Sequence, residues 1–256
     1  MTAQVRRPAE PHRPQRDLPR TDDLPLPATR LLHSRARGVL ARAIHGLWDL
    51  EVRGAERVTT DGPLVMVGNH IGFLDGPVMA IVGPRPVHAL TKQELFSGPL
   101  GAFLRATGQI PIDRDNVDPR ALRTALAVLR AGGLVGVFPE RTRGDGTMRS
   151  VAGGAAYLAM ATGALVVPVS FLGTRRPGSD ATFPPRGDRL VMSFGEPLAL
   201  PRRGWPRLAA EVRAGTERIR LAVVANAEDA SRATGLALPG PLPTADAGPQ
   251  SSKEQQ

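Results

Sequence analysis

The sequence predicts an α/β fold: a single domain with a mixed, largely buried sheet flanked by helices, plus an N-terminal amphipathic helix. Short apolar runs rich in β-branched residues alternate with segments of helical periodicity, which is the order of elements in α/β domains. Several of these runs are apolar almost throughout, as expected of strands that are covered on both faces. A hydrophobic content of 41% over 256 residues is enough for one sizeable core.

The domain is predicted to span residues 29–232. The expected strands are 63–68, 86–91, 107–112, 134–138, 164–172 and 188–194. The expected helices are 29–48, 75–82, 94–105, 117–131, 150–162 and about 205–232. Residues 1–28 and 233–256 are rich in proline and polar residues without periodicity, so both are predicted to be disordered tails.

Residues 29–48 form the predicted amphipathic helix, in which a Leu/Val/Ile stripe ending in Trp48 opposes a basic face without acidic residues. This composition is typical of a helix that lies on an anionic membrane surface. An ordinary helix that packs its stripe on the core fits the same pattern, and the sequence leaves both readings open. The basic residues of the segment are Arg30, Arg35, Arg37 and Arg42.

A net charge of +9 predicts an anionic partner. Nucleic acid is not the expected one, because only two tryptophans and one tyrosine are available to stack on bases and no nucleic-acid-binding motif is present. The absence of cysteine excludes disulfides, thiolate metal sites and a cysteine nucleophile. There is neither an apolar run of about 18 residues nor a secretory leader, so we expect a cytoplasmic protein, peripheral on the inner face of the cell membrane.

His70 and Asp75 follow the run 63–68 directly, at a spacing that suggests a catalytic pair. Residues five apart on one helix point about 140° away from each other, so the two side chains meet only if a turn intervenes, and Gly72 permits one. An aspartate bonded to one imidazole nitrogen leaves the other free to take a proton from a hydroxyl. The alternative is that Asp75 merely caps the following helix.

Two further polar segments end apolar runs. Gly108–Arg114 closes on the pair Asp113 and Arg114, and Arg114 could bind a phosphate or simply form a surface ion pair. The segment Phe138-Pro139-Glu140-Arg141-Thr142-Arg143-Gly144 brings together a carboxylate, a hydroxyl and two guanidiniums, which suits a phosphate or a plain polar turn. A fourth segment, Val166–Val169, contains Pro168, which in a strand indicates an edge, a bulge or the boundary of a site.

In order and spacing these four segments resemble the conserved blocks of the glycerolipid (lysophospholipid) acyltransferase family, of the 1-acylglycerol-3-phosphate acyltransferase type. The family patterns are N-H-x4-D, G-x-I-P-I-D-R, F-P-E-G-T-R-S and V-x-P-V. Lys92-Gln93-Glu94-Leu95 is similar to a further family segment, K-x-E-L. The resemblance covers about residues 60–200.

The third block departs from the family pattern at two positions. Arg141 stands where the family has glycine, and Gly144 stands where it often has serine. We expect an arginine at this position to lose access to positive φ and to add a cation beside the acceptor pocket. The departure therefore bears on the identity of the acceptor more than on the reaction type.

The resemblance implies acyl transfer from acyl-CoA or acyl carrier protein to the hydroxyl of lysophosphatidate, giving phosphatidate. His70 would act as the general base and Asp75 would orient it. The implied substrate-binding residues are Lys92, Arg114, Glu140, Thr142 and Arg143, with Glu140 positioning Arg143 or a hydroxyl of the acceptor. No metal or cofactor is expected beyond the acyl thioester. Other readings are a different lysophospholipid or an aminolipid as acceptor, and a non-catalytic lipid- or nucleic-acid-binding protein.

Overall fold

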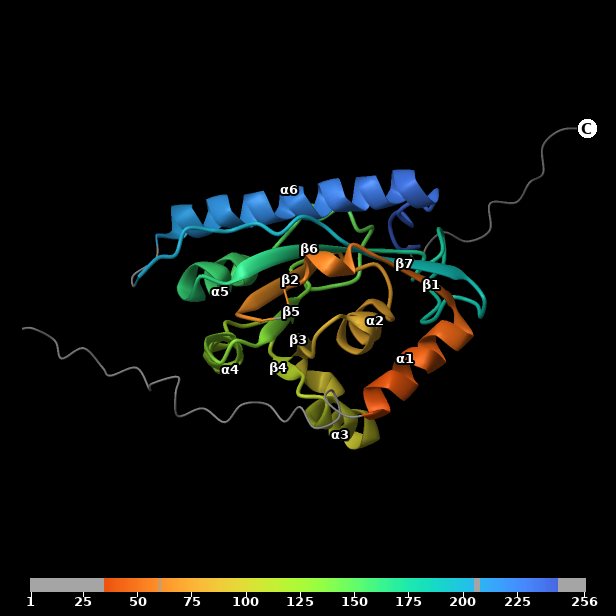
Figure 1. The fold of residues 1–256 in the computed structure, drawn as a ribbon, viewed down its shortest axis with the longest axis horizontal. Coiled ribbons are helices and arrows are strands. Elements are labelled where there is room, and N and C mark those ends of the chain that lie inside the picture. The colour runs from red at the N-terminus through yellow and green to blue at the C-terminus, as the bar shows by residue number, and fades with distance from the viewer. Residues whose placement is uncertain (1–34, 60, 205–207, 244–256) are drawn as a thin grey trace, which may run out of the picture.

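The fold is built on one mixed seven-stranded sheet with the strand order β1-β7-β6-β2-β5-β3-β4 (Figure 1). The computed structural model describes residues 35–59, 61–204 and 208–243. All neighbouring strands run parallel except β6 and β7, which are antiparallel. The α/β class and the mixed sheet are confirmed. The strands are β1 (Asp49–Arg53), β2 (Leu64–Gly68), β3 (Val87–Lys92), β4 (Ile110–Ile112), β5 (Leu134–Val137), β6 (Leu165–Leu172) and β7 (Arg189–Phe194).

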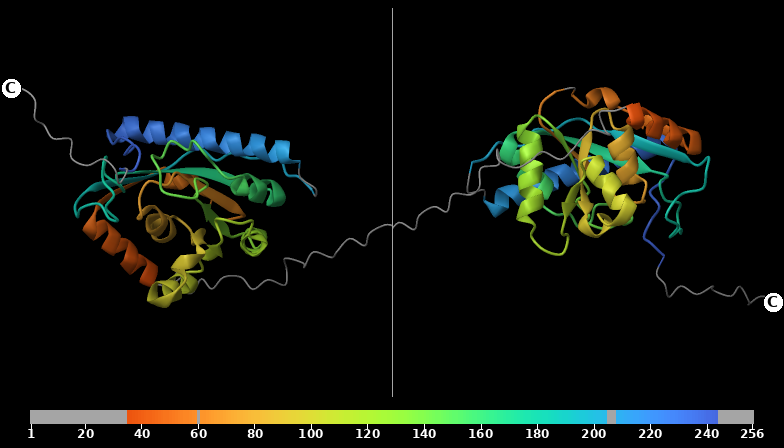
Figure 2. Two further views of the ribbon diagram at one scale, coloured as in Figure 1. Left: turned by 180° about the vertical axis from the view of Figure 1, so that it is seen from behind. Right: turned by 90° about the horizontal axis from the view of Figure 1, so that it is seen from below.

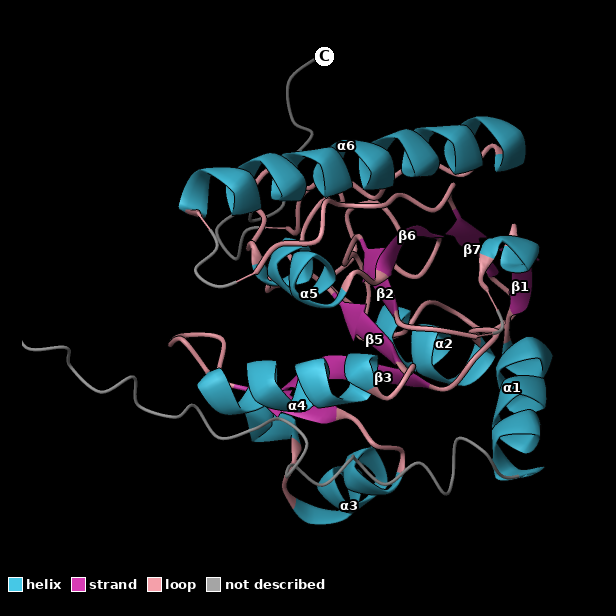
Figure 3. Cartoon of the chain, turned by 60° about the vertical axis from the view of Figure 1, so that its left-hand side comes forward, coloured by secondary structure: helices cyan, strands magenta, loops and turns pink. Residues whose placement is uncertain are grey.

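Helices cover both faces of the sheet, with α1 and α2 on one side and α6 on the other (Figure 1). α4 and α5 share the α6 side, whereas α3 stands near the β4 end of the sheet (Figure 3). None of these described helices combines the length and the apolar character needed to cross a bilayer. The helices are α1 (Arg35–Leu47), α2 (Asp75–Val82), α3 (Gly98–Ala106), α4 (Pro119–Arg130), α5 (Gly154–Thr162) and α6 (Ala209–Thr234), with short 3-10 turns η2 (Ala55–Arg57) and η3 (Gln93–Leu95).

The central strands supply two apolar clusters, one on each face, because successive side chains alternate across a sheet. In β6, Val166 packs with α4, α5 and α6, whereas Val167 and Phe171 pack with α1 and α2. β2 is buried along its whole length in the same way. The apolar runs that predicted buried strands therefore fill both layers of the core.

Pro168 lies at a bulge, one of the three positions predicted for it. β6 is a central strand, and its antiparallel pairing with β7 begins at Val169 and Phe194. On the other side of Pro168, Val166 bridges Leu198, so the register slips by one residue between the two pairs. The Gly195 amide donates to the Pro168 carbonyl. Because proline has no backbone N–H, the irregular pairing at this position leaves no donor unsatisfied.

The apolar stripe of α1 packs on the core. Ile44 and Trp48 are buried in the cluster on that face, and the Arg37 guanidinium donates to the carbonyls of Ile81 and Gly83 at the end of α2. These contacts favour the core-packing reading of the predicted amphipathic helix. Its basic face remains exposed at Arg35 and Arg42, and residues 29–34, with Arg30, lie outside the described residues.

Two boundaries differ from the prediction. β1 is absent from the predicted strands because its sequence, DLEVR, is mostly charged; it forms an edge strand beside β7. The tail predicted to begin at residue 233 starts inside α6, and residues up to 243 are part of the described structure. Leu236 and Leu238 pack on core residues beyond the helix, which explains their place in a segment otherwise rich in proline and glycine. Residues 1–28 and 244–256 lie outside the described residues.

Candidate functional site

The predicted site residues come together around one cavity of about 540 Å³ at the carboxyl ends of parallel strands. Loops that follow β2, β3, β4 and β5 meet there because parallel strands end at the same edge of a sheet. Of the seven residues predicted from the sequence, five line the cavity: His70, Lys92, Arg114, Thr142 and Arg143. Asp75 and Glu140 stand behind His70.

His70 and Asp75 form the predicted pair. The Nδ1 atom of His70 lies 2.9 Å from Asp75 Oδ2, and the Asp75 side chain is fully buried. Asp75 is the first residue of α2, and residues 70–74 form the turn that carries His70 back over it. The alternative that Asp75 only caps the helix is not what the structure shows, because the carboxylate faces the preceding turn.

Four donors converge on the Asp75 carboxylate. Its Oδ2 accepts the amides of Ile71 (2.7 Å) and Gly72 (2.8 Å) besides the His70 ring, and its Oδ1 accepts the Thr174 hydroxyl. A carboxylate held in this way by four donors fixes the orientation of the imidazole and favours the tautomer with the proton on the nitrogen that faces it. Nδ1 then carries the proton and Nε2 keeps a free lone pair on the ring that lines the cavity.

Gly72 is required by close packing. A Cβ built on this residue would lie 2.4 Å from the Thr174 carbonyl oxygen. Gly72 does not have positive φ, so the reason for glycine differs from the conformational freedom that the sequence suggested. The loop after β6 is pressed against the His70 turn at this point.

Glu140 holds the His70 turn from the other side. Its Oε2 accepts the His70 amide (2.7 Å), its Oε1 accepts the Met148 amide (3.3 Å), and Phe138 stacks on the His70 ring with 4.6 Å between centroids. Burial raises the pKa of the Glu140 carboxyl, although these hydrogen bonds oppose the shift. Both Glu140 oxygens accept backbone amides of neighbouring loops, a role that the sequence did not indicate, and the predicted contact with Arg143 or the acceptor stays a prediction.

Three cations line the cavity. Lys92, Arg114 and Arg143 all line it, and none of its lining residues is acidic. The Arg114 guanidinium also donates to the Arg141 carbonyl, which joins the second block to the third. Lys92 is 3.7 Å from Glu94 and about half exposed. These groups are suited to hold a phosphate, with Arg114 and Arg143 offering planar forked donors.

Arg141 adopts the backbone conformation that glycine would favour. Its φ is 64°, in the left-handed region, so the expectation that arginine loses access to positive φ at this position is wrong. Such a conformation costs of order 1–3 kcal/mol for a non-glycine residue and persists where the surroundings impose it. Here the Arg141 carbonyl is held by Arg114, and its side chain is exposed.

Three residues of the site were not found from the sequence. Thr174 bonds Asp75, the buried Arg175 donates to the Ile71 carbonyl, and Leu242 lines the cavity. They follow His70 by about 100 residues or more, without a spacing that would mark them. The Gly173–Thr174 turn after the apolar run 164–172 was the one available signal, since it marks the carboxyl end of a further strand.

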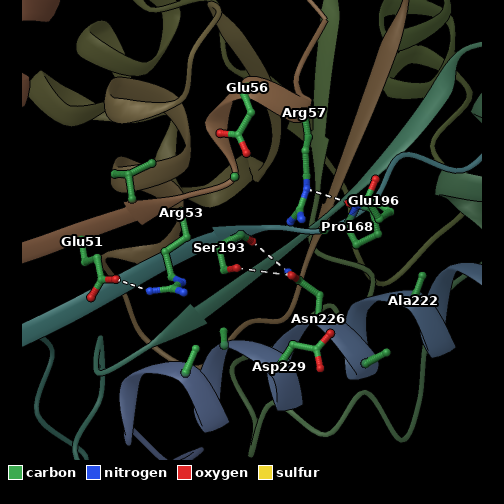
Figure 4. A pocket seen from close by; sticks show the side chains of 16 residues that line it. Glu51, Arg53, Glu56, Arg57, Pro168, Ser193, Glu196, Ala222, Asn226 and Asp229 are labelled. Carbon is green, nitrogen blue, oxygen red and sulfur yellow. Dashed lines mark hydrogen bonds and ion pairs between the residues drawn. The ribbon is translucent and has the colours of Figure 1, made fainter.

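A second cavity, of about 720 Å³, lies between α6 and the β1–β7 edge (Figure 4). Its charged side chains are largely paired with each other, as in Arg57–Glu196 at 2.9 Å, and Asn226 is bonded to Ser193. No histidine lines it. Within the described part of the chain, no group of three or more histidine, aspartate or glutamate side chains is arranged to ligate a metal. The chemistry of a proton acceptor beside cations belongs to the cavity at His70.

Comparisons with known proteins point to one family. A family model described as Acyltransferase matches residues 49–172. The 1-acyl-sn-glycerol-3-phosphate acyltransferase of Bacillus subtilis (strain 168) is 30% identical over 179 residues, which are 67% of this chain and 86% of that protein. The chloroplastic 1-acyl-sn-glycerol-3-phosphate acyltransferase LPAT1 of Arabidopsis thaliana is 32% identical over 139 residues, 52% of this chain and 38% of that one.

A solved structure has the same fold. The crystal structure of the 1-acyl-sn-glycerophosphate (LPA) acyltransferase PlsC from Thermotoga maritima superposes with a TM-score of 0.59 at 25% identity, over 76% of this chain and 78% of that one.

Proposed function

The chain belongs to the acyltransferase family, and from this premise we propose that it transfers a fatty acyl group from a thioester to the free hydroxyl of lysophosphatidate, giving phosphatidate for phospholipid synthesis. The observation that carries the proposal is the buried Asp75 carboxylate on Nδ1 of a histidine whose ring lines a largely apolar cavity together with three cations. Relatives named for this activity support the choice of acceptor.

His70 is the general base of the proposed reaction. Nε2 takes the proton of the acceptor hydroxyl while the oxygen attacks the thioester carbonyl, and the tetrahedral intermediate then expels the thiolate. The imidazolium returns the proton to the leaving sulfur, so the enzyme ends unchanged and no covalent acyl-enzyme is formed. Base catalysis of this kind contributes about 10²–10⁴-fold. Asp75 stabilises the imidazolium and keeps the ring in place.

Arg114, Arg143 and Lys92 hold the acceptor phosphate in this proposal, and Thr142 lies beside them on the cavity wall. Fixing the phosphate fixes the distance from the hydroxyl to Nε2, which is the orientation that speeds a reaction between two bound substrates. Fatty chains occupy the apolar remainder, whose walls include Phe73, Pro77, Ile81, Leu100, Phe103 and Leu104.

The acyl substrates are amphiphiles, so we also propose that the protein works on an anionic membrane surface. Four exposed apolar side chains border the cavity, on η3, on α3 and in the C-terminal segment: Leu95, Leu100, Phe103 and Leu242. Arg105 on α3 is exposed beside them. An apolar rim with basic neighbours suits contact with anionic lipid.

A donor-by-acceptor matrix with the purified full-length chain tests the proposed function. Acyl-CoA and acyl carrier protein thioesters are each paired with lysophosphatidate, other lysophospholipids, an aminolipid and glycerol 3-phosphate, and products are identified by mass. We expect phosphatidate from lysophosphatidate, at a kcat/KM at least about tenfold above any other acceptor. Charge-assisted contacts, at about 1.5–3 kcal/mol each, favour its phosphomonoester over phosphodiesters and aminolipids, and its fatty chain buries apolar surface that glycerol 3-phosphate lacks. Preference for another acceptor, or no turnover by the folded protein, would refute the assignment.

A further inference from the structure

The segment that follows α6 returns to the catalytic turn. The helix ends at Thr234, and Gly235 turns the chain in a left-handed conformation, with its amide bonded to the Ser231 carbonyl. In the right-hand view of Figure 2 the segment is the dark blue stretch that leaves α6 toward the C-terminal trace. Residues 236–243, which we call the strap, have no regular secondary structure but three defined contacts with the site.

Leu238 anchors the strap. It packs against core residues on the α1–α2 side as well as against the small cluster under α6. A Cβ on Gly146 would lie 2.9 Å from the Leu238 side chain and 2.6 Å from that of Ile71. The loop of the third block therefore lies between the strap and the residue that follows His70, and Leu242 ends at the cavity lined by His70.

Arg175 joins the strap to the catalytic turn. Its Nε donates to the Ile71 carbonyl (2.9 Å), and its Nη2 donates to the carbonyls of Gly144 (2.9 Å) and Gly240 (2.5 Å). One side chain thus holds three separate segments: the turn after β2, the loop after β5 and the strap. The adjacent residue, Thr174, carries the hydroxyl on Asp75.

Burying the Arg175 guanidinium costs free energy that a purely structural residue would not need to spend. Only 3% of it is exposed, and it forms no ion pair with any carboxylate of the described chain; its partners are backbone carbonyls. Burial lowers the pKa of the Arg175 guanidinium, although the Asp145 and Asp75 carboxylates oppose the shift from beyond ion-pair distance. Burying such a cation is expensive, and apolar side chains could fill a core position more cheaply. What the guanidinium supplies, and an apolar residue cannot, is a fixed distance between three loops.

We propose that the strap and Arg175 form one positioning device that holds the His70–Gly72 turn in its reactive geometry. Arg175 does not touch the cavity, so it is a positioning residue. The strap supplies the Gly240 carbonyl, which accepts a hydrogen bond from the Arg175 guanidinium. The guanidinium, held in this way, restrains the Ile71 carbonyl to which it also donates.

Hydrogen exchange of the full chain measures this device without any substrate. The amides of His70, Ile71 and Gly72 are all hydrogen-bonded, so loosening of the turn appears as faster exchange in a peptide that spans residues 69–75. We expect Arg175→Met and deletion of residues 240–256 each to speed this exchange at least about tenfold, with α4 unchanged. Arg175→Lys should fall between Arg175→Met and the unmodified chain.

Matched controls separate the device from general damage. Arg176→Met alters the neighbouring arginine, which is exposed and paired with Asp188, and deletion of residues 244–256 spares the strap. Leu242→Ser alters only the strap's contact with the cavity. Exchange in residues 69–75 should stay at the level of the unmodified chain in all three.

Combination of the two changes provides the decisive result. If the strap acts through Arg175, the double variant should exchange no faster than the faster single variant, because both changes break one connection. Unchanged exchange in both single variants, or effects that multiply in the double variant, would overturn the proposal. Should Arg175→Met fail to fold, the deletion of residues 240–256, which leaves Leu238 in place, decides alone. Unchanged exchange in residues 69–75 of that variant would overturn the proposal.

A second test, which rests on the proposed function, measures kcat of the variants with whichever acceptor the wild type acylates. The two single variants should lose kcat about tenfold or more, because small displacements of a catalytic group are costly. The exchange measurements use no substrate, so they do not depend on which acceptor the enzyme takes. Failure of the proposed function is therefore distinguishable from failure of the proposed positioning role of Arg175 and the strap.

Discussion

The Asp75 carboxylate has no exposed surface, yet it accepts hydrogen bonds from the His70 ring, two backbone amides and the Thr174 hydroxyl. Each donor removes part of the cost of burying the charge. At this scale the reactivity of His70 is a property of its neighbours, since they decide which ring nitrogen keeps its lone pair.

Thr174→Val keeps the shape of the side chain but leaves Asp75 Oδ1 without its donor. We predict that kcat falls about tenfold, since an unsatisfied buried acceptor costs about 1–3 kcal/mol and the carboxylate regains freedom to turn away from His70. Thr174→Ser, which restores the hydroxyl, should recover most of the rate. Equal kcat values in the folded Val variant and the wild type would show that this hydrogen bond does not support the pair.

Arg143→Ala and Arg114→Ala test the acceptor phosphate site. We predict that each raises the KM for the acceptor by about 10–100-fold, the equivalent of one charge-assisted hydrogen bond, while the KM for the donor changes little. Arg143 gives the cleaner result, because Arg114 also holds the Arg141 carbonyl. Arg130→Ala, an exposed change of equal charge at the end of α4, serves as the control. A loss confined to the donor KM would assign these arginines to the thioester instead.

Sequence reasoning reached His70 and Asp75 through the resemblance of residues 69–75 to the N-H-x4-D block of the acyltransferase family, because the spacing alone left helix capping by Asp75 open. It missed Thr174, whose contact with Asp75 spans 99 residues. It gave the wrong reason for Gly72 and did not indicate that Glu140 holds the His70 amide, since a glycine and a carboxylate are compatible with several roles until the neighbouring loop is in place. Long-range contacts decide those roles, and a single sequence does not state them.

The central strands were predicted well because buried parallel strands are almost wholly apolar, which is a strong local signal. β1 carries charges on an edge and lacks that signal. The end of the domain was misplaced for a similar reason: Leu236 and Leu238 are only two apolar residues among prolines and glycines. For α1, amphipathicity was recognised, but the same stripe fits core or membrane, and packing with α2 favours the core.

α3 is therefore the element that we expect to meet the bilayer. The chain has no cysteine, so a single cysteine that carries an environment-sensitive dye reports one position. With anionic vesicles, the dye at Leu100→Cys should become brighter, and salt should weaken the response because exposed charges are screened beyond about 8 Å at physiological ionic strength. The matched position on α6, Leu221→Cys, is similarly exposed and should not respond.

Val39→Cys reports α1 in the same experiment, since Val39 is 61% exposed on that helix. A response at Val39 without one at Leu100 would assign membrane contact to α1. A response at Leu221 alone would contradict any contact at the cavity rim.

In the whole molecule, the parallel strands gather segments that are far apart in the sequence at one edge of the sheet. The turn after β2 supplies His70, the proposed base. The end of β3 and the loops after β4 and β5 supply the cations, and the loop after β6 supplies Thr174 and Arg175. Four recognisable blocks in order indicated this convergence, because in an α/β sheet such blocks follow strands. The cavity's shape and the strap depend on side chains that meet only in the folded chain.

The central claim is that His70 is the base for acyl transfer, and single-turnover kinetics of His70→Ala test it most directly. With the acyl thioester and lysophosphatidate both bound, we predict a rate at least about 10²–10⁴-fold below that of the wild type, the usual contribution of a general base. His70 is partly exposed and its ring packs on Phe138 alone among the described rings, so the variant should keep a wild-type circular dichroism spectrum. A folded His70→Ala variant that acylates lysophosphatidate within a few-fold of the wild-type rate would contradict the account.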